Sequence, residues 1–390
     1  MEPPDEGKDS SFPTTGVPAG ERLAPVLTRR RRPSKVTIMV ILVLVVVGSL
    51  FAGPQVWLTL HTPLLSLITF DPPSDWNLLS DNYLHLITVG TDGNVWFLPE
   101  SGHWIGRLTS RGAFSRTPLL DSQQDGHSVG WIQFQRGADG MLWAGGIGKN
   151  DLWRIDPRTG TSSNYPYEFE DMTIAHDGSL WYFNSFMLGN NVEHVNLRTK
   201  VLQTYPVDPK IGSLMCCAHG ITETADGTIW FAVAPTPSLD GTGPGKTGII
   251  RLDPRTGAMT FFSLEPMGFN GFVGLTPAAD RGVWLEGSIS PFIRILIHLS
   301  RTGVMTRYEA PNQGDVLLFT LAPNGDPWMI YKESHAWLTS PYVLARGEPG
   351  GTVIPMGRIA GAEPRAMTFG PNHHLWIATG ERIEYVDLPG

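Results

Sequence analysis

Cysteine is almost absent from this chain of 390 residues, and its two cysteines, Cys216 and Cys217, are adjacent. Adjacent thiols cannot supply the four spaced ligands of a structural zinc site, nor the two-residue spacing of a thioredoxin-like pair. In an oxidising compartment they could form a disulfide that stiffens the loop before His219, or they could stay as two partly buried thiols. A soft-metal site is a third alternative.

Long stretches with apolar residues at a period of 3.6 are also missing, which excludes helical repeat arrays. Basic residues are in the minority, because 22 Lys and Arg face 32 Asp and Glu once the first 35 residues are set aside. An acidic surface without a basic stripe argues against nucleic acid as a partner.

Only one apolar run is long enough to approach the thickness of a bilayer, and it includes residues Val36 to Ala52. We predict a transmembrane signal anchor over residues 36–53. A cleaved signal peptide is the alternative, but Leu50-Phe51-Ala52 is a poor match to a cleavage site with two small residues.

Five basic residues, Arg29 to Arg32 and Lys35, precede this run. Because positive charge stays on the cytosolic side, we expect a single-pass protein of the cell membrane with residues 54–390 on the extracytoplasmic side. Residues 1–35, rich in Pro, Gly and charge, predict a disordered cytoplasmic tail.

Seven tryptophans follow an acidic or amide turn residue by four positions and recur every 38 to 54 residues. The turn residues and tryptophans are Asp92 and Trp96, Asp139 and Trp143, Asp177 and Trp181, Asp226 and Trp230, Asp280 and Trp284, Asn324 and Trp328, and Asn372 and Trp376. Four positions before each turn residue stands a threonine, except for Gln135. This period is typical of propeller blades, so the sequence predicts an all-β, seven-bladed β-propeller.

The fourth repeat shows how a blade is built. We expect strands at 219–225, 229–234, 249–253 and 259–264, with a tight turn at Asp226-Gly227, where glycine tolerates a positive φ. Tryptophan is expected to fill the space between neighbouring blades, since large aromatic side chains dominate cores and seven equivalent copies cannot all be catalytic.

The last repeat provides a strand at 382–387 and then the chain stops, so blade seven lacks its fourth strand. We expect the segment Leu65 to Phe70 to supply that strand and close the ring, which would remove exposed strand edges.

Connections of variable length all fall on one side of the predicted ring, which is where propellers usually bind. The positions seven before each turn residue begin the inner strands on that side and are His85, Ile132, Glu170, His219, Val273, Leu317 and Arg365. Four of the seven are polar, which suggests a small-molecule or peptide ligand at the channel mouth; polar side chains wetted by channel water are the alternative.

Two aromatic residues in the variable loops, Trp104 and Trp337, add candidate contacts for a sugar or a cyclic peptide. The alternative is that they pack the loops against the rim.

The segment His219-Gly220-Ile221-Thr222, followed by Asp226 to Phe231, resembles the virginiamycin B lyase (streptogramin B lyase) family. The likeness extends over all seven repeats, from about residue 84 to residue 387. It implies a seven-bladed propeller that opens a cyclic depsipeptide by elimination, with a histidine base, a magnesium ion held by glutamates and a substrate-binding histidine in the preceding blade.

The base position of that family corresponds to His219, which is therefore the candidate catalytic residue. The family places one glutamate two residues before the base and another three residues after the blade tryptophan, where this chain has Cys217 and Val233. The preceding blade has Glu170 in place of the histidine. Magnesium is thus implied only by the resemblance, and no metal ligand is assigned.

A second match to the base position is His85. Its two glutamate positions are Tyr83 and Pro99, with Glu100 one position late and Arg365 in the neighbouring blade. His85, Glu170, Arg365, Trp104 and Trp337 are the candidate substrate-binding residues.

Two functions follow from the sequence. The first is a membrane-anchored, extracytoplasmic C–O lyase acting on cyclic depsipeptides or related ligands. The alternative is a non-catalytic propeller that binds a peptide, glycan or protein partner.

Overall fold

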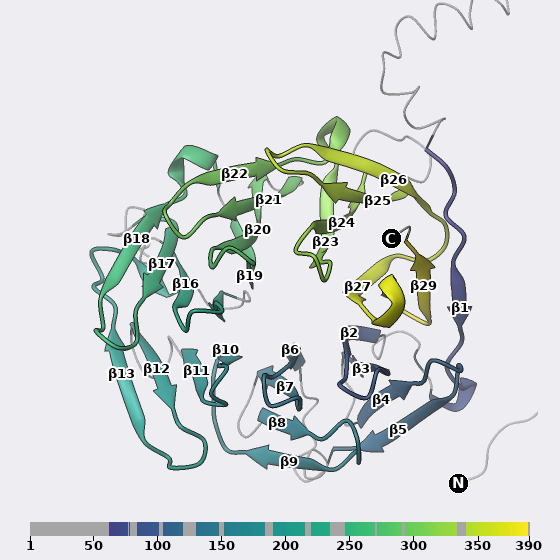
Figure 1. The fold of residues 1–390 in the computed structure, drawn as a ribbon, viewed down its shortest axis with the longest axis horizontal. Coiled ribbons are helices and arrows are strands. Elements are labelled where there is room, and N and C mark those ends of the chain that lie inside the picture. The colour runs from purple at the N-terminus through teal and green to yellow at the C-terminus, as the bar shows by residue number, and fades with distance from the viewer. Residues whose placement is uncertain are drawn as a thin grey trace, which may run out of the picture. The chain divides into compact units, whose positions relative to one another are not determined.

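The computed structural model describes residues 62–76, 78, 84–100, 104–119, 130–147, 152–183, 190–214, 220–234, 246–269, 271–290, 293–333 and 341–388. In this part of the chain, seven antiparallel sheets surround a central channel (Figure 1). The predicted seven-bladed β-propeller is therefore confirmed. The tail at 1–35 and the anchor at 36–53 lie outside the described residues. Among the residues that are described, no helix has the length and apolarity needed to cross a bilayer.

Each blade runs outward from an inner strand beside the channel to an outer strand at the rim. Blade one contains β2 (Leu84–Val89), β3 (Val95–Pro99), β4 (Trp104–Leu108) and β5 (Phe114–Pro118), blade two contains β6 (Gly130–Arg136), β7 (Leu142–Ile147), β8 (Leu152–Ile155) and β9 (Ser162–Tyr165), and blade three contains β10 (Asp171–Ile174), β11 (Leu180–Phe183), β12 (Asn191–Val195) and β13 (Leu202–Pro206). Blade four contains β14 (Ser213–Leu214), β15 (Ile221–Glu223), β16 (Ile229–Ala234), β17 (Gly248–Leu252) and β18 (Met259–Ser263), and blade five contains β19 (Gly271–Pro277), β20 (Val283–Ser290), β21 (Ile293–Leu299) and β22 (Met305–Tyr308). Blade six contains β23 (Asp315–Leu321), β24 (Pro327–Lys332), β25 (Tyr342–Gly347) and β26 (Val353–Ile359), and blade seven contains β27 (Pro364–Phe369), β28 (His374–Thr379), β29 (Ile383–Asp387) and β1 (Ile68–Phe70). Short 3-10 helices occur at η1 (Ser74–Trp76), η2 (Glu265–Met267), η3 (Pro311–Gln313) and η4 (Pro371–His373).

The repeated tryptophans occupy the same place in every blade. Each lies on the second strand and is paired across the sheet with the threonine of its repeat, or with Gln135 in blade two. All seven are buried, and each packs with the apolar residues of the following blade, as Trp230 does with Leu275 and Val283 of blade five. The expected role of tryptophan between blades is confirmed.

The turn between the first and second strands explains the acidic residue of the repeat. In blade one the backbone N–H of Asn94 and the indole Nε1 of Trp96 both donate to Asp92 Oδ1, at 3.2 and 3.1 Å. Gly93 has a φ of 73°, a left-handed conformation that glycine adopts without strain. In blade one the aspartate thus holds the turn and also satisfies the buried indole N–H, whereas in blade four the indole N–H of Trp230 has no partner among the described residues.

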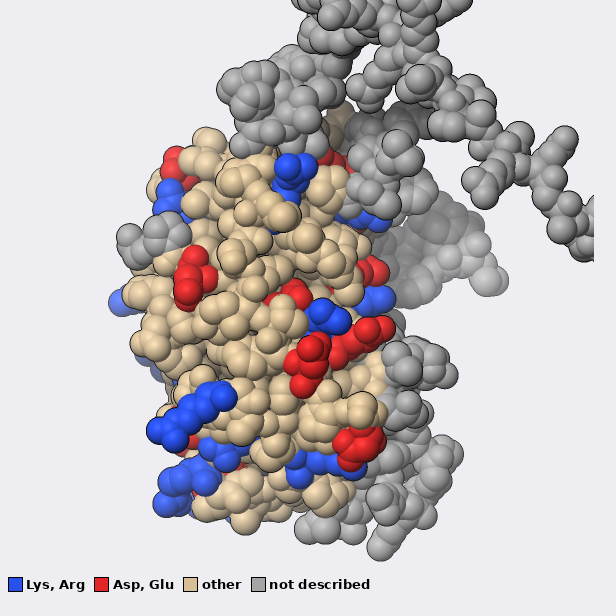
Figure 2. Space-filling view, turned by 90° about the vertical axis from the view of Figure 1, so that its right-hand side faces the viewer, with Lys and Arg blue, Asp and Glu red and all other residues tan. Residues whose placement is uncertain are grey.

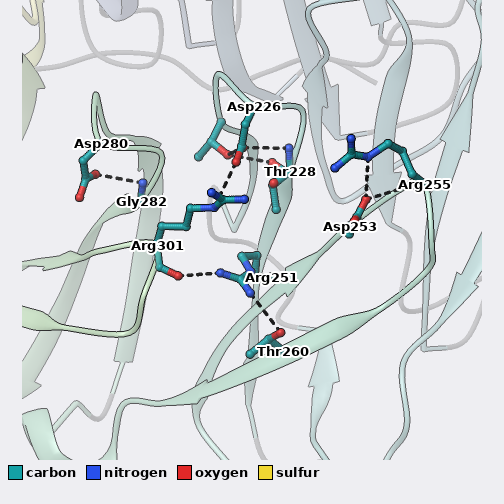
Figure 3. A network of polar contacts seen from close by, with 10 residues as sticks. Asp226, Thr228, Arg251, Asp253, Arg255, Thr260, Asp280, Gly282 and Arg301 are labelled. Carbon is teal, nitrogen blue, oxygen red and sulfur yellow. Dashed lines mark hydrogen bonds and ion pairs between the residues drawn. The ribbon is translucent and has the colours of Figure 1, made fainter.

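On this side of the ring, called the turn side, the turns of neighbouring blades are linked to one another (Figure 3). Arg301 of blade five forms an ion pair with Asp226 of blade four at 3.3 Å, and its carbonyl oxygen accepts a hydrogen bond from Arg251 Nη1 at 2.6 Å. The charged side chains at these turns therefore serve the architecture.

The ring closes through β1, which pairs antiparallel with β29 over Ile68 to Phe70 (Figure 1). The paired strand is shorter than the expected segment, because Leu64 and Leu65 contact Arg358 of β26 in blade six instead. The chain before β1 thus touches blade six, and β1 itself completes blade seven.

Seen from the side of the ring that carries β1, acidic and basic side chains are interspersed over the surface (Figure 2). No continuous basic stripe crosses this face among the residues described. Exclusion of nucleic acid as a partner stays a prediction.

Candidate functional site

Five of the seven candidate channel-mouth residues share an irregular backbone position. In five blades the pairing of the inner strand skips one residue, and the skipped residues are His85, Ile132, Val273, Leu317 and Arg365. Such a bulge leaves the extra residue out of the ladder and redirects its side chain. The position that the sequence analysis chose at the start of the inner strands is therefore, in these five blades, also the position that the fold leaves out of strand pairing.

Five residues at this end of the ring, called the loop side, form a polar group that we name the His85 cluster. It consists of His85, Glu100, Tyr342, Glu363 and Arg365, which come from blades one, six and seven. His85 interacts electrostatically with Glu100 and with Arg365, and Arg365 Nη2 forms an ion pair with Glu363 Oε2 at 3.3 Å. Tyr342, the first residue of β25, is within the electrostatic range of both Glu363 and Arg365.

The cluster sets the charge of its histidine. Burial lowers the pKa of His85 from its ordinary 6.5; the negative charge of Glu100 opposes this effect, and the positive charge of Arg365 adds to it. His85 is therefore neutral near pH 7 and offers one hydrogen-bond donor and one acceptor. The side chains of Arg365 and Glu363 stay 40% and 50% exposed, so a ligand can reach them.

Glu170 lies in another part of the ring, directly before β10, and its backbone N–H donates to the carbonyl oxygen of Phe183 at 3.0 Å. The neighbouring Asp171, which sequence reasoning missed, is 1% exposed. It accepts hydrogen bonds from Gln133 Nε2 at 3.1 Å, from the Met172 N–H at 2.8 Å and from the Gly220 N–H. Burial raises the pKa of Asp171 well above its ordinary range, although the backbone N–H groups of Gly220, Met172 and Ile221 oppose the shift.

Asp171 thus joins blades two, three and four at one level of the channel. Gln133, Asp171 and Gly220 stand one position after the channel-mouth residues in three successive repeats. A comparison of that position across the seven repeats would have found Asp171, since no other repeat has an acidic residue there.

Trp104 is part of an aromatic group at the rim rather than of the His85 cluster. Its ring lies 5.1 Å from that of Trp76 and 6.2 Å from that of Phe97, and Arg116 stacks 5.9 Å from its centroid. A role in sugar or peptide binding stays a prediction. The proposed base His219, the cysteine pair and Trp337 lie outside the described residues.

A second feature missed by sequence reasoning lies inside the channel. A cavity there is lined by inner strands of blades one to five together with Glu286, which belongs to the second strand of blade five. Burial raises the pKa of Glu286 to about 7, partly opposed by the positive charge of Arg294.

The metal centre implied by the resemblance finds no support in the donor set. Val233, at the family's second glutamate position, is fully buried and has no metal-binding atom. Nowhere in the described ranges do three His, Cys, Asp or Glu side chains gather in a way that could hold a metal ion. The described residues therefore do not fit a magnesium ion.

Fold and site together define a seven-bladed β-propeller with a polar cluster at the loop-side mouth of its channel. Among solved structures, a streptogramin B lyase is similar with a TM-score of 0.61 and 19% identity, over 83% of this chain and 98% of that chain. Virginiamycin B lyase from Staphylococcus aureus is similar with a TM-score of 0.60 and 18% identity, over 83% and 100%.

The extracellular domain of a putative one component system from B. thetaiotaomicron is similar with a TM-score of 0.57 and 14% identity, over 84% of this chain and 40% of that chain. No family model and no curated protein matches the chain. At these identities the likeness establishes the seven-bladed fold.

Proposed function

We propose that this chain is a membrane-anchored, extracytoplasmic propeller that binds a peptide-like ligand over the loop-side mouth of its channel. The observation that carries the proposal is the His85 cluster, in which side chains from three blades converge at one end of the ring. A peptide backbone alternates donors and acceptors, and the cluster offers both: Arg365 donates, Glu363 and Glu100 accept, and neutral His85 does either.

The ligand class is supported by similarity as well as by chemistry. A structurally similar virginiamycin B lyase was solved with quinupristin, at a TM-score of 0.59 and 17% identity. Quinupristin is therefore a reasonable first probe.

Binding is tested by titrating quinupristin into the full-length protein in detergent. We expect Arg365→Ala to weaken binding about tenfold or more, because it removes a charged donor. Arg281→Ala, at a turn-side position of blade five, is the matched control and should bind as the wild type does. Equal affinities for both variants and the wild type would contradict the proposed site.

A C–O lyase reaction is the second candidate function, and the neutral state of His85 beside Arg365 favours it. A neutral imidazole can accept a proton from the carbon next to a carbonyl group, and a nearby guanidinium can stabilise the enolate that forms. The electron pair then forms a carbon–carbon double bond as the adjacent C–O bond breaks, and the ester departs as a carboxylate.

Mass spectrometry of the product distinguishes elimination from hydrolysis. Elimination opens the ring without a change in mass, whereas hydrolysis adds the mass of one water molecule. We expect His85→Ala to abolish an elimination product while quinupristin binding is weakened but still measurable. If no product of either kind forms with the wild type, the lyase candidate fails and the binding proposal stands.

The membrane anchor is tested independently. The full chain should stay in the membrane fraction after carbonate extraction, and a chain lacking residues 36–53 should not. Protease added to intact cells should reach the propeller. Release of the full chain by carbonate would refute the anchor.

A further inference from the structure

Glu286 occupies a position that the other six blades fill with apolar residues or glycine. It stands two residues after the blade tryptophan, where the equivalents are Leu98, Gly145, Phe183, Ala232, Ile330 and Ala378. All six of those residues are buried. A carboxyl group at such a place is unfavourable unless something satisfies it.

The surroundings of Glu286 do not satisfy it. No hydrogen bond or ion pair joins its carboxylate to any residue of the described chain. Arg294, whose positive charge acts on Glu286, directs Nε and Nη2 at the two carboxylate oxygens of Asp315, both at 3.1 Å. Two buried acids differ from the partly buried Glu286, because Glu193 accepts a hydrogen bond from Thr204 at 2.7 Å and Glu384 accepts one from Thr69 at 3.3 Å.

The fold leaves room for the Glu286 side chain to reach the channel. Glu286 is paired across the sheet with Gly274 of the inner strand β19. Directly opposite residues of an antiparallel pair point to the same side, so a side chain at position 274 would stand beside that of Glu286. Glycine keeps that space open, and both residues line the channel cavity.

A second acceptor without a donor faces the same cavity. Gln133 uses its Nε2 group to donate to Asp171, and its buried Oε1 atom has no hydrogen-bond partner in the described chain. Gln133 lines the cavity together with Glu286. The walls therefore present two unsatisfied acceptors, one of them able to carry a negative charge.

The other residues that line the cavity indicate what kind of ligand could donate hydrogen bonds to these two acceptors. Apolar side chains of Leu86, Ile132, Phe134, Ile221 and Leu275 line the cavity beside the hydroxyl groups of Thr173, Thr222 and Thr276. A ligand that suits this lining has a cationic group with several N–H donors and an attached apolar part. A primary alkylammonium group fits both requirements.

We propose that the channel contains a second binding site, lined by none of the five residues of the His85 cluster, which takes a primary alkylammonium group through Glu286 and Gln133. The ammonium donates to the Glu286 carboxylate and to Gln133 Oε1, while its alkyl chain lies against the apolar wall. The site does not depend on the His85 cluster or on the proposed peptide ligand.

The test uses n-butylammonium chloride with the full-length protein in detergent, at a pH above the pKa of Glu286. Saturation-transfer NMR should detect binding, and Glu286→Gln should weaken it by about tenfold or more. Gly274→Ala should also weaken it, because a methyl group would narrow the space beside the carboxylate. Glu193→Gln is the matched control, since this buried acid has its own partner outside the cavity.

Neutral n-butanol, Mg²⁺ and K⁺ serve as comparison probes. The proposal is overturned if n-butanol binds as well as n-butylammonium, if either metal ion displaces the amine at equal concentration, or if Glu286→Gln binds like the wild type. Thermal unfolding of each variant verifies that it is folded. If Glu286→Gln does not fold, unchanged binding by Gly274→Ala overturns the proposal by itself.

Discussion

Single residues of this propeller differ sharply in how well their charge is compensated. Asp171 has three donors around a carboxylate that is 1% exposed. Glu286 has none in the described part of the chain, and only the more distant Arg294 offsets its burial. Ionisation of Glu286 should therefore work against folding.

The pH dependence of stability provides the first prediction. The folded-state pKa of Glu286 is raised from 4.5 to about 7, so the folded protein holds a proton that the unfolded chain releases. The free energy of unfolding should decrease as pH rises through this interval, by up to about 3 kcal/mol, and level off above it. Glu286→Gln should lack this decrease.

Urea unfolding of both proteins at pH values below and above the interval measures the effect. Glu286→Gln should gain stability over the wild type only on the alkaline side. A constant difference at all pH values would show that Glu286 does not titrate as stated.

At the scale of elements, the repeated turn depends on one aspartate or asparagine side chain whose number of partners varies between blades. Asp92 accepts hydrogen bonds from Asn94 and Trp96 and forms an ion pair with Arg107 at 3.1 Å. Asn324 of blade six accepts a backbone hydrogen bond from Asp326 at 3.1 Å and carries no charge. The turn of blade one should therefore depend more strongly on its acidic residue.

The second prediction compares these two turns. Asp92→Ala should lower the free energy of unfolding by about 2 to 3 kcal/mol, because the indole N–H loses its acceptor and Arg107 its partner. Asn324→Ala should lower it by about 1 kcal/mol. Denaturant titration of the two variants measures both values, and an equal loss would contradict the role assigned to the indole and the arginine.

The same turns show why the blades could be predicted from the sequence. The spacing of turn residue, threonine and tryptophan placed the second strand of blade four at 229–234, and β16 has these bounds. Residues four apart across a tight turn are brought together by local geometry alone, so the pattern can be recognised within a short segment of the sequence.

Less of the candidate site could be predicted from the sequence. His85 and Arg365 were chosen for their position in the repeat, but their proximity depends on blades one and seven being neighbours, which only ring closure brings about. Glu286 was missed because the repeats were compared on the first strand and the turn. Its unusual environment becomes evident only when the second strands are compared as well.

At the scale of the whole molecule, the ring is held closed by a short strand. β1 has three residues and pairs with β29, and the ring of Phe70 lies 5.8 Å from Trp376 and 6.0 Å from Tyr385. Because Phe70 belongs to the aromatic core shared by blades seven and one, it should carry much of the closure energy.

The third prediction concerns this closure. Phe70→Ala should lower the free energy of unfolding by about 2 kcal/mol, since the side chain is only partly buried. Ile68→Ala, at the exposed end of the same strand where the side chain is 43% exposed, should change it by less than about 0.5 kcal/mol. Thermal and denaturant unfolding measure both, and similar losses would argue against closure through Phe70.

The order of the closing strands also constrains how the protein is made. β1 emerges from the ribosome before every other strand described, whereas its partner β29 emerges after all of them. The nascent chain must therefore keep the edge of β1 unpaired while six blades assemble, a stage at which unpaired edges invite aggregation. A premature stop that removes the final strand would leave every earlier blade intact and the circle still open.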